Sequence, residues 1–159
     1  MMQFGGRYLV DAGRDAVWRA LNNTEVLKAA IPGCHKIEWL DETSLALVIK
    51  VNLGLVQPTF SGDLVLSDVR PAERYRLSGK GRGGLLGLAE AEADIVLTDS
   101  AGGTVLDFAA TGGASGQIMK LGQSLIGNSA QRVIDGFFAR FGAAMGARVT
   151  ALPRAADPA

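Results

Sequence analysis

The sequence contains few side chains that can carry out covalent or metal chemistry. Its one cysteine and one histidine, Cys34 and His35, are neighbours. A zinc site takes four Cys or His ligands, or three with a water molecule, so this pair cannot form one. A Ser-His-Asp triad would depend on His35, which is better explained as the start of a strand. Cys34 has two interpretations, a thiolate stabilised near a helix end or a buried structural thiol. We predict no catalytic residue and no metal ligand.

Two further patterns resemble functional motifs but lack the context that those motifs need. Residues 79–84 match G-x-G-x-x-G. The dinucleotide fingerprint lies between a strand and a helix, whereas here an alternating strand follows. We interpret these glycines as allowing strand curvature and a flexible hairpin. Glu90 and Glu92 are predicted on the solvent side of a strand, away from any pocket suited to acid–base catalysis.

The composition excludes several classes of protein. Sixteen basic and sixteen acidic residues give a net charge of zero, so we predict no nucleic-acid partner. A single cysteine cannot form a disulfide within the chain, which suits a reducing compartment. No apolar run reaches the roughly 18 residues of a membrane span, and the N-terminus lacks a signal peptide's apolar stretch. We expect a cytoplasmic protein.

Hydrophobic periodicity predicts an α+β domain. A period of two predicts seven strands, at residues 3–10, 35–40, 45–52, 59–67, 74–81, 88–97 and 104–111. Two short helices, at 14–22 and 24–31, follow the first strand, and a period of 3.6 over 116–148 predicts one long C-terminal helix. The expected architecture is a curved seven-stranded antiparallel sheet around that helix. We predict a single domain at 1–150 and a disordered tail at 151–159.

Charged residues indicate how two of these strands pair. A hairpin centred on Leu85 places Arg76 opposite Asp94 and Lys80 opposite Glu90. Opposite charges across a strand pair are worth roughly 0.2–1 kcal/mol each and help to fix the register. These side chains therefore mark the solvent face of the sheet.

Small residues on the opposite face of the sheet predict a cavity. Gly79, Gly81, Ala89, Ala91, Ala93, Ala110 and Gly112 face the long helix in this arrangement. They imply either an empty apolar pocket or a helix that packs very closely, with Phe137, Phe138 and Phe141 filling the space. We expect the pocket. Its predicted lining residues are Leu77, Ala91, Ala93, Phe108, Ala110, Leu125, Val133 and Phe137.

Loops at one end of the predicted sheet are unusually apolar. Alternate connections of a meander lie at the same end, and contiguous exposed apolar surface marks docking or ligand-access sites. The alternative is that these side chains fold back and close the end of the core. The residues of this apolar rim are Pro32, Leu53, Leu55, Val56, Leu85, Leu86, Ile118 and Met119.

Several short segments form a specific combination. They are Val17-Trp18, AIPGC at 30–34, FSGD at 60–63, LSD at 66–68, LSGKG at 77–81, LGQSLI at 121–126 and FFARF at 137–141. With them, over residues 2–146, the chain resembles the carbon monoxide dehydrogenase G-subunit (CoxG) family. That family belongs to the START-like (SRPBCC) helix-grip superfamily of ligand-binding domains. The resemblance implies a helix-grip fold with a cavity between the sheet and the long helix.

The resemblance also implies a function. Family members are non-catalytic accessory proteins of molybdenum-containing carbon monoxide dehydrogenases and related hydroxylases, and aid membrane attachment. The expected ligand is an apolar small molecule, quinone-like or lipid, with no covalent cofactor. Residues 116–159 hold five basic and two acidic residues, which favours peripheral contact with the anionic inner face of the cytoplasmic membrane.

Two other functions stay open. The domain could be a ligand-free adaptor that docks the enzyme through the apolar rim. It could also be an enzyme of the cyclase or aromatase kind, which would need polar groups converging inside the cavity; the predicted lining offers none.

Overall fold

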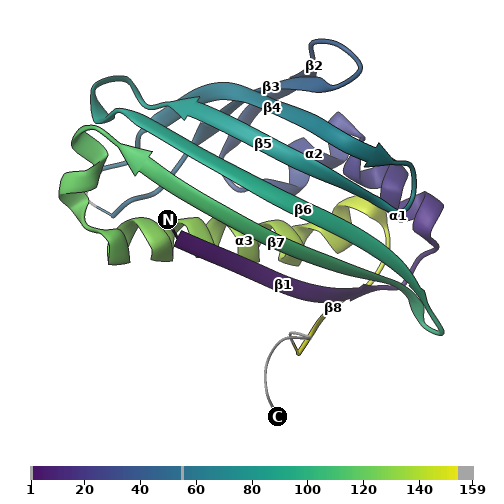
Figure 1. Cartoon of the computed structure of the whole chain (residues 1–159). Coiled ribbons are helices and arrows are strands. Elements are labelled where there is room, and N and C mark those ends of the chain that lie inside the picture. Colours follow the sequence, from purple (N-terminus) through teal and green to yellow (C-terminus); the bar gives the residue numbers. More distant parts are fainter. Residues whose placement is uncertain (1, 55, 154–159) are drawn as a thin grey trace.

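The described residues, 2–54 and 56–153 of a computed structural model, form one eight-stranded antiparallel sheet and three α-helices (Figure 1). The strand order is β2-β3-β4-β5-β6-β7-β1-β8. The elements in chain order are β1 (Met2–Val10), α1 (Arg14–Leu21), α2 (Thr24–Ala30), β2 (Cys34–Trp39), β3 (Ser44–Lys50), β4 (Thr59–Arg70), β5 (Arg74–Arg82), η1 (Gly84–Leu86), β6 (Leu88–Ser100), β7 (Gly103–Ser115), η2 (Gln117–Leu121), α3 (Gln123–Met145) and β8 (Val149–Leu152).

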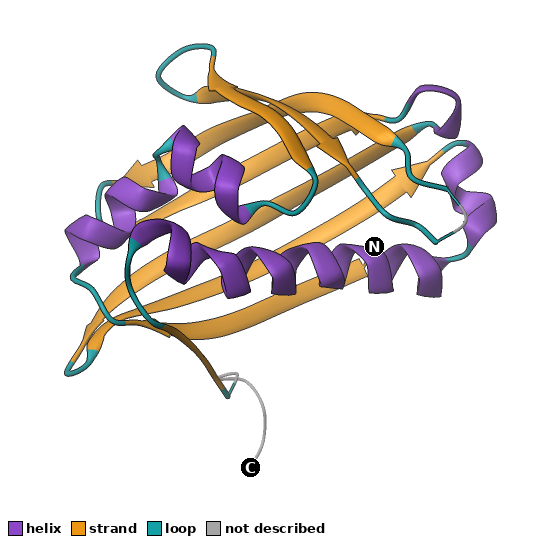
Figure 2. Cartoon of the chain, turned by 180° about the vertical axis from the view of Figure 1, so that it is seen from behind, coloured by secondary structure: helices purple, strands orange, loops and turns teal. Residues whose placement is uncertain are grey.

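All three helices lie on the same face of the sheet, which we call the inner face. Figure 2 shows α3 crossing that face, with α1 and α2 beside one half of it. Helix α2 packs against α3, and α3 meets the sheet mainly at β1 and β8. The α+β class and the curved sheet around a long helix are thus confirmed.

The predicted hairpin register is confirmed. Arg76 pairs with Asp94 and Lys80 with Glu90 across β5 and β6. The guanidinium Nε of Arg76 donates to Oδ1 of Asp94 at 3.0 Å. Because residues alternate along a strand, this register fixes which side chains of β5, β6 and β7 point toward the helices.

The sheet has one strand more than predicted. Residues Val149–Leu152 form β8, in which Val149 pairs with Val10 and Leu152 with Arg7. The predicted disordered tail is therefore wrong for Ala151 and Leu152, and residues 154–159 lie outside the described part of the chain. Four residues are too few to show an alternating pattern, and the free edge of β1 supplies their hydrogen-bonding partners.

The C-terminal helix is shorter than predicted. Residues 117–121 form the 3₁₀ helix η2, and α3 has 23 residues, a length of about 35 Å. Gly116 and Gly122 separate these elements with φ values of +93° and +90°, which side-chain-bearing residues rarely adopt. The pattern of apolar residues does not reveal the break between η2 and α3, because Ile118 and Ile126 are buried on either side of it. Gly127 lies within α3, where an added Cβ would lie 3.3 Å from Sδ of Met2.

Buried apolar residues form two separate clusters. The larger one joins α1, α2 and α3 to the centre of the sheet, around Val10, Leu106 and Phe141. The smaller one lies where β4 begins and α3 begins, and it consists of Leu53, Phe60, Ile118 and Ile126. The inner face between the clusters carries mainly alanine and glycine.

Candidate functional site

An apolar cavity of about 200 Å³ lies on the inner face, within the larger cluster. It is enclosed by the sheet on one side and by residues of all three helices on the other. Its lining residues are Leu21, Asn22, Leu27, Ile31, Ile37, Leu45, Leu64, Leu66, Tyr75, Leu77, Ala93, Ile95, Leu106, Phe108, Phe137 and Phe138.

Strand register places the sheet side of this cavity. Leu77 pairs with Ala93, and Ala93 pairs with Ala110 across β6 and β7. Ala93 has the smallest side chain among the lining residues and faces the middle of α3, where Phe137 and Phe138 project. A small residue opposite two aromatic rings leaves the space that a larger side chain would fill.

Strand β1 positions the helix side. The ring of Tyr8 stacks on that of Phe138 with 3.9 Å between the ring centroids. The ring centroids of Phe138 and Phe108 are 5.4 Å apart. Gly6 makes room for this group, because a Cβ there would lie 2.7 Å from the ring of Tyr8. The aromatic side chains are therefore held by the sheet and do not collapse into the cavity.

Four of the eight predicted lining residues line this cavity: Leu77, Ala93, Phe108 and Phe137. Ala91 and Ala110 do not, although the register places them on the same face. Ala91 is exposed despite facing inward, so the inner face is open at this point. Leu125 and Val133 are half-buried on α3 but lie outside the cavity lining.

Gly79 of β5 and Gly83, which directly follows this strand, have a different role from the one predicted. A Cβ at Gly79 would lie 2.8 Å from Cδ2 of Leu64, and one at Gly83 would lie 2.6 Å from the ring of Phe60. Side chains of β4 thus fill the space beside these glycines. Close packing explains Gly79 and Gly83 but not Gly81, where a Cβ would lie an ordinary 3.5 Å from Cβ of Phe60. Open space remains beside Ala91 of β6, which is exposed.

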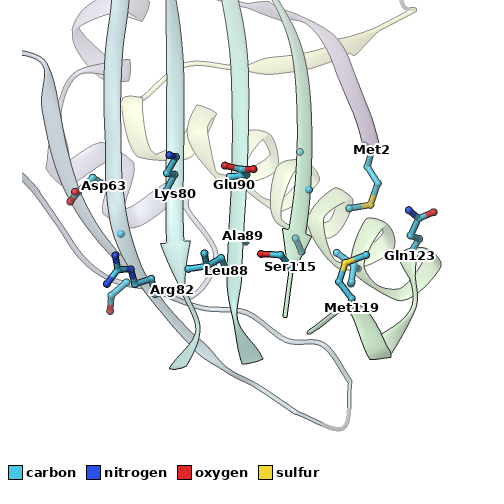
Figure 3. A pocket seen from close by; sticks show the side chains of 16 residues that line it. Met2, Asp63, Lys80, Arg82, Leu88, Ala89, Glu90, Ser115, Met119 and Gln123 are labelled. Atoms are coloured by element: carbon cyan, nitrogen blue, oxygen red, sulfur yellow. The ribbon is translucent and has the colours of Figure 1, made fainter. Parts of the chain in front are cut away.

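A larger hollow of about 680 Å³ lies near the start of α3 (Figure 3). Ala89 and Gly112 line it from the inner face, while Asp63, Lys80 and Glu90 belong to the outer face. Its walls thus come from both faces of the sheet, so it is open space around the end of the sheet. The smaller cavity has a predominantly apolar lining and lies on the inner face alone, so it is the better candidate for a binding site.

The structure changes the predicted apolar rim. Leu53 and Ile118 are each 3% exposed and close the end of the core with Phe60, so the alternative of inward-folded side chains holds for them. Leu86 is half-buried against the same cluster. Pro32 packs against α3, where a Cβ at Gly136 would lie 2.7 Å from its Cγ.

Exposed apolar side chains remain at that end. Leu85 is 95% exposed at the tip of η1. Leu55 lies outside the described residues. The members of this exposed end patch are Val56, Leu85, Leu88 and Met119, of which Leu88 was not predicted.

The sequence analysis did not predict that residues of α1, α2, β2, β3 and β4 line the cavity, nor that Tyr75 of β5 does. Tyr75 occupies an inner position of β5 and is 5% exposed. Burial raises the pKa of its hydroxyl above the usual range, so this residue is neutral at physiological pH. The alternation of Tyr75 with Leu77 would have placed it on the inner face.

The reactive side chains lie away from the cavity. His35 is exposed, and Cys34 is half-buried with its Sγ 3.5 Å from the carbonyl oxygen of Lys36. Burial raises the pKa of the Cys34 thiol, although this hydrogen bond and the charge of Lys28 oppose the shift. A raised pKa favours the structural thiol over the reactive thiolate. The described residues contain no group of three or more His, Cys, Asp or Glu arranged to hold a metal ion.

Comparison with known proteins assigns the family. Residues 6–146 match the model of the carbon monoxide dehydrogenase G-subunit, CoxG. The chain belongs to this family. Membership supports an accessory role at a coarse level. Among curated proteins, none matches the chain.

Solved structures show that this CoxG-family chain has a helix-grip fold. A conserved protein from Geobacillus kaustophilus superposes with a TM-score of 0.81 at 22% identity, covering 93% of this chain and 99% of its own. The structure of Ara h 8.0201 superposes with a TM-score of 0.64 at 16% identity, covering 91% of this chain and 98% of its own. The Zhui aromatase/cyclase from Streptomyces sp. R1128 gives 0.57 at 15% identity, with coverages of 90% and 94%. Among the described residues, no helix is long and apolar enough to cross a bilayer.

Proposed function

We propose that this chain is a non-catalytic accessory protein that holds an apolar small molecule, quinone- or lipid-like, for a molybdenum-containing carbon monoxide dehydrogenase or related hydroxylase. The observation that carries the proposal is the 200 Å³ apolar cavity in a member of the CoxG family. An apolar cavity of about 150 Å³ accepts benzene, so this one has room for a substituted ring or a short length of acyl chain.

The lining favours binding over chemistry. Two of its residues, Asn22 and Tyr75, are polar, and none of those described is charged. Acid–base catalysis needs a group that changes protonation near the working pH. Tyr75 stays neutral there because burial raises its pKa. Burial of apolar ligand surface, at roughly 25 cal/mol per Å², would supply the affinity.

The exposed end patch supports a second part of the proposal, peripheral docking at the cytoplasmic face of the membrane. Exposed leucine and methionine side chains gather there beside the basic residues Arg82 and Lys120. Such a surface suits an anionic bilayer. The same exposure of Leu85 also favours an adaptor that docks the enzyme directly and carries no ligand.

One substitution tests whether the cavity holds a ligand. Ala93→Phe places a ring in the cavity, so the variant should lose the small molecule that the wild-type protein retains. The matched control is Ala109→Phe, on the outer face of β7, where the added ring reaches solvent. Native mass spectrometry and organic extraction of chains purified from the original host give the bound molecule directly.

Two results would reject the ligand-carrier proposal: a wild-type protein that carries no small molecule, or an Ala93→Phe variant that carries as much as the control. Enzyme association that persists in the first case would favour the adaptor.

A further inference from the structure

The hydroxyl of Tyr75 has no hydrogen-bond partner among the described residues. Burial alone accounts for its raised pKa, with no contribution from a hydrogen bond. The hydroxyl oxygen is not fully enclosed by the protein, so it keeps some accessible surface. Tyr75 is 5% exposed and is one of the residues that line the cavity.

The ring of Tyr75 is fixed from outside the cavity. Trp18 of α1 meets it edge-on, with 5.2 Å between the ring centroids. This contact holds the ring against α1 and limits where the hydroxyl can go. A buried hydroxyl without a partner is costly, and structures normally satisfy such a group with protein, water or ligand.

The other polar lining residue already uses its donor. The amide Nδ2 of Asn22 donates to the carbonyl oxygen of Trp18 at 2.9 Å. Among the described lining residues, Tyr75 therefore supplies the uncommitted hydrogen-bond donor in an otherwise apolar wall. A donor at this position strengthens the binding of a ligand that carries an acceptor oxygen, whereas a bound hydrocarbon leaves the donor without a hydrogen bond.

We propose that Tyr75 is the specificity-determining residue of the cavity, donating a hydrogen bond to an oxygen on the ring of an apolar ligand. This inference rests on the proposed ligand-carrying function and narrows its ligand class. Ring compounds with an oxygen at the buried edge are preferred over hydrocarbon rings and over acyl chains, whose inner end carries only methyl and methylene groups.

Two probes of nearly equal shape test the inference. Tetramethyl-1,4-benzoquinone carries two carbonyl oxygens, and 1,2,4,5-tetramethylbenzene has the same four methyl positions without them. The fully substituted quinone ring also resists addition by the Cys34 thiol. Affinities are measured calorimetrically for the wild-type chain, for Tyr75→Phe, and for Ser78→Ala, a control that removes a hydroxyl from the outer face of the same strand.

The wild-type protein and Ser78→Ala should bind the quinone about three to ten times more tightly than the hydrocarbon. Tyr75→Phe should bind both probes equally and lose none of its affinity for the hydrocarbon. The infrared carbonyl stretch of the bound quinone should lie at lower wavenumber in the wild type than in Tyr75→Phe. A merely structural role for Tyr75 would not produce this shift.

The outcomes separate the two proposals. Equal wild-type affinities for both probes, or a preference and carbonyl shift that persist in Tyr75→Phe, would overturn the role of Tyr75 and leave the carrier function intact. Failure of the wild-type protein to bind either probe would overturn both. A loss of affinity for both probes in Tyr75→Phe would show that the residue only shapes the cavity, which also rejects the inference.

Discussion

Leu85 is the most exposed large apolar side chain among the described residues. Its side chain is 95% exposed at the tip of η1. An exposed leucine contributes little to the stability of the folded monomer, whereas burying it in a bilayer or a protein contributes about 1.5–3 kcal/mol. The effects of a substitution at Leu85 on folding and on docking can therefore be separated.

Leu85→Ser should weaken binding to vesicles of phosphatidylglycerol and phosphatidylethanolamine by about tenfold, which corresponds to about 1.4 kcal/mol. Co-sedimentation measures the partition, and urea unfolding should show a stability within about 0.5 kcal/mol of wild type. The matched control is Leu40→Ser, 57% exposed in the β2–β3 turn at the other end of the sheet. Equal vesicle binding by both variants and the wild type would argue against a membrane contact at this end.

Single residues of the site were predictable where strand alternation determines direction. Ala93 and Leu77 follow from the charge-matched register of β5 and β6, and Phe137 from the helical stripe. Loop side chains were not predictable in this way. Leu53 and Ile118 turn inward and pack with Phe60, closing the end of the core. These contacts join residues far apart in the sequence, so local periodicity does not predict them.

At the scale of elements, the contact between the α2–β2 connection and α3 is a tight one across the inner face. Pro32 rests on Gly136, where an added Cβ would lie 2.7 Å from the proline Cγ. Gly136 lowers the helix propensity of α3 by up to about 1 kcal/mol, and the close approach of Pro32 explains why a glycine stands there. Their chain neighbours Ile31 and Phe137 line the cavity.

A double-mutant cycle tests that contact. Gly136→Ala should lower the free energy of unfolding of the wild-type chain by about 1–3 kcal/mol, because the methyl group displaces Pro32. In a Pro32→Ala background the same substitution should be neutral or stabilising by up to about 1 kcal/mol, since only the helix-propensity gain remains. Urea denaturation of the four chains gives the coupling energy. Additive effects would show that Pro32 and Gly136 do not constrain each other.

Most elements were predictable, and the exceptions have physical reasons. The strands and short helices agree with their periodicity to within a few residues. The unbroken helix over 116–148 was wrong because Gly116 and Gly122 interrupt it without disturbing the order of its apolar residues. Strand β8 was missed because its pairing depends on the free edge of β1, a long-range feature.

At the scale of the whole molecule, the interior is partly open although side chains of α3 join the larger apolar cluster with the sheet. The helix is supported at β1, at β8 and by α2, while the middle of β6 and β7 presents alanine. The larger apolar cluster surrounds the cavity and the smaller one closes the end of the core near the start of α3, and the space between sheet and helix stays partly unfilled.

The most direct test of this account is an isotope-filtered nuclear Overhauser spectrum of the chain, labelled at its alanine methyl groups and saturated with tetramethyl-1,4-benzoquinone. The account predicts cross-peaks from the methyl groups of the quinone to Ala93 and none to Ala109, which lies on the opposite face of the sheet. Cross-peaks confined to alanines outside the cavity, or none to Ala93 at saturation, would contradict it.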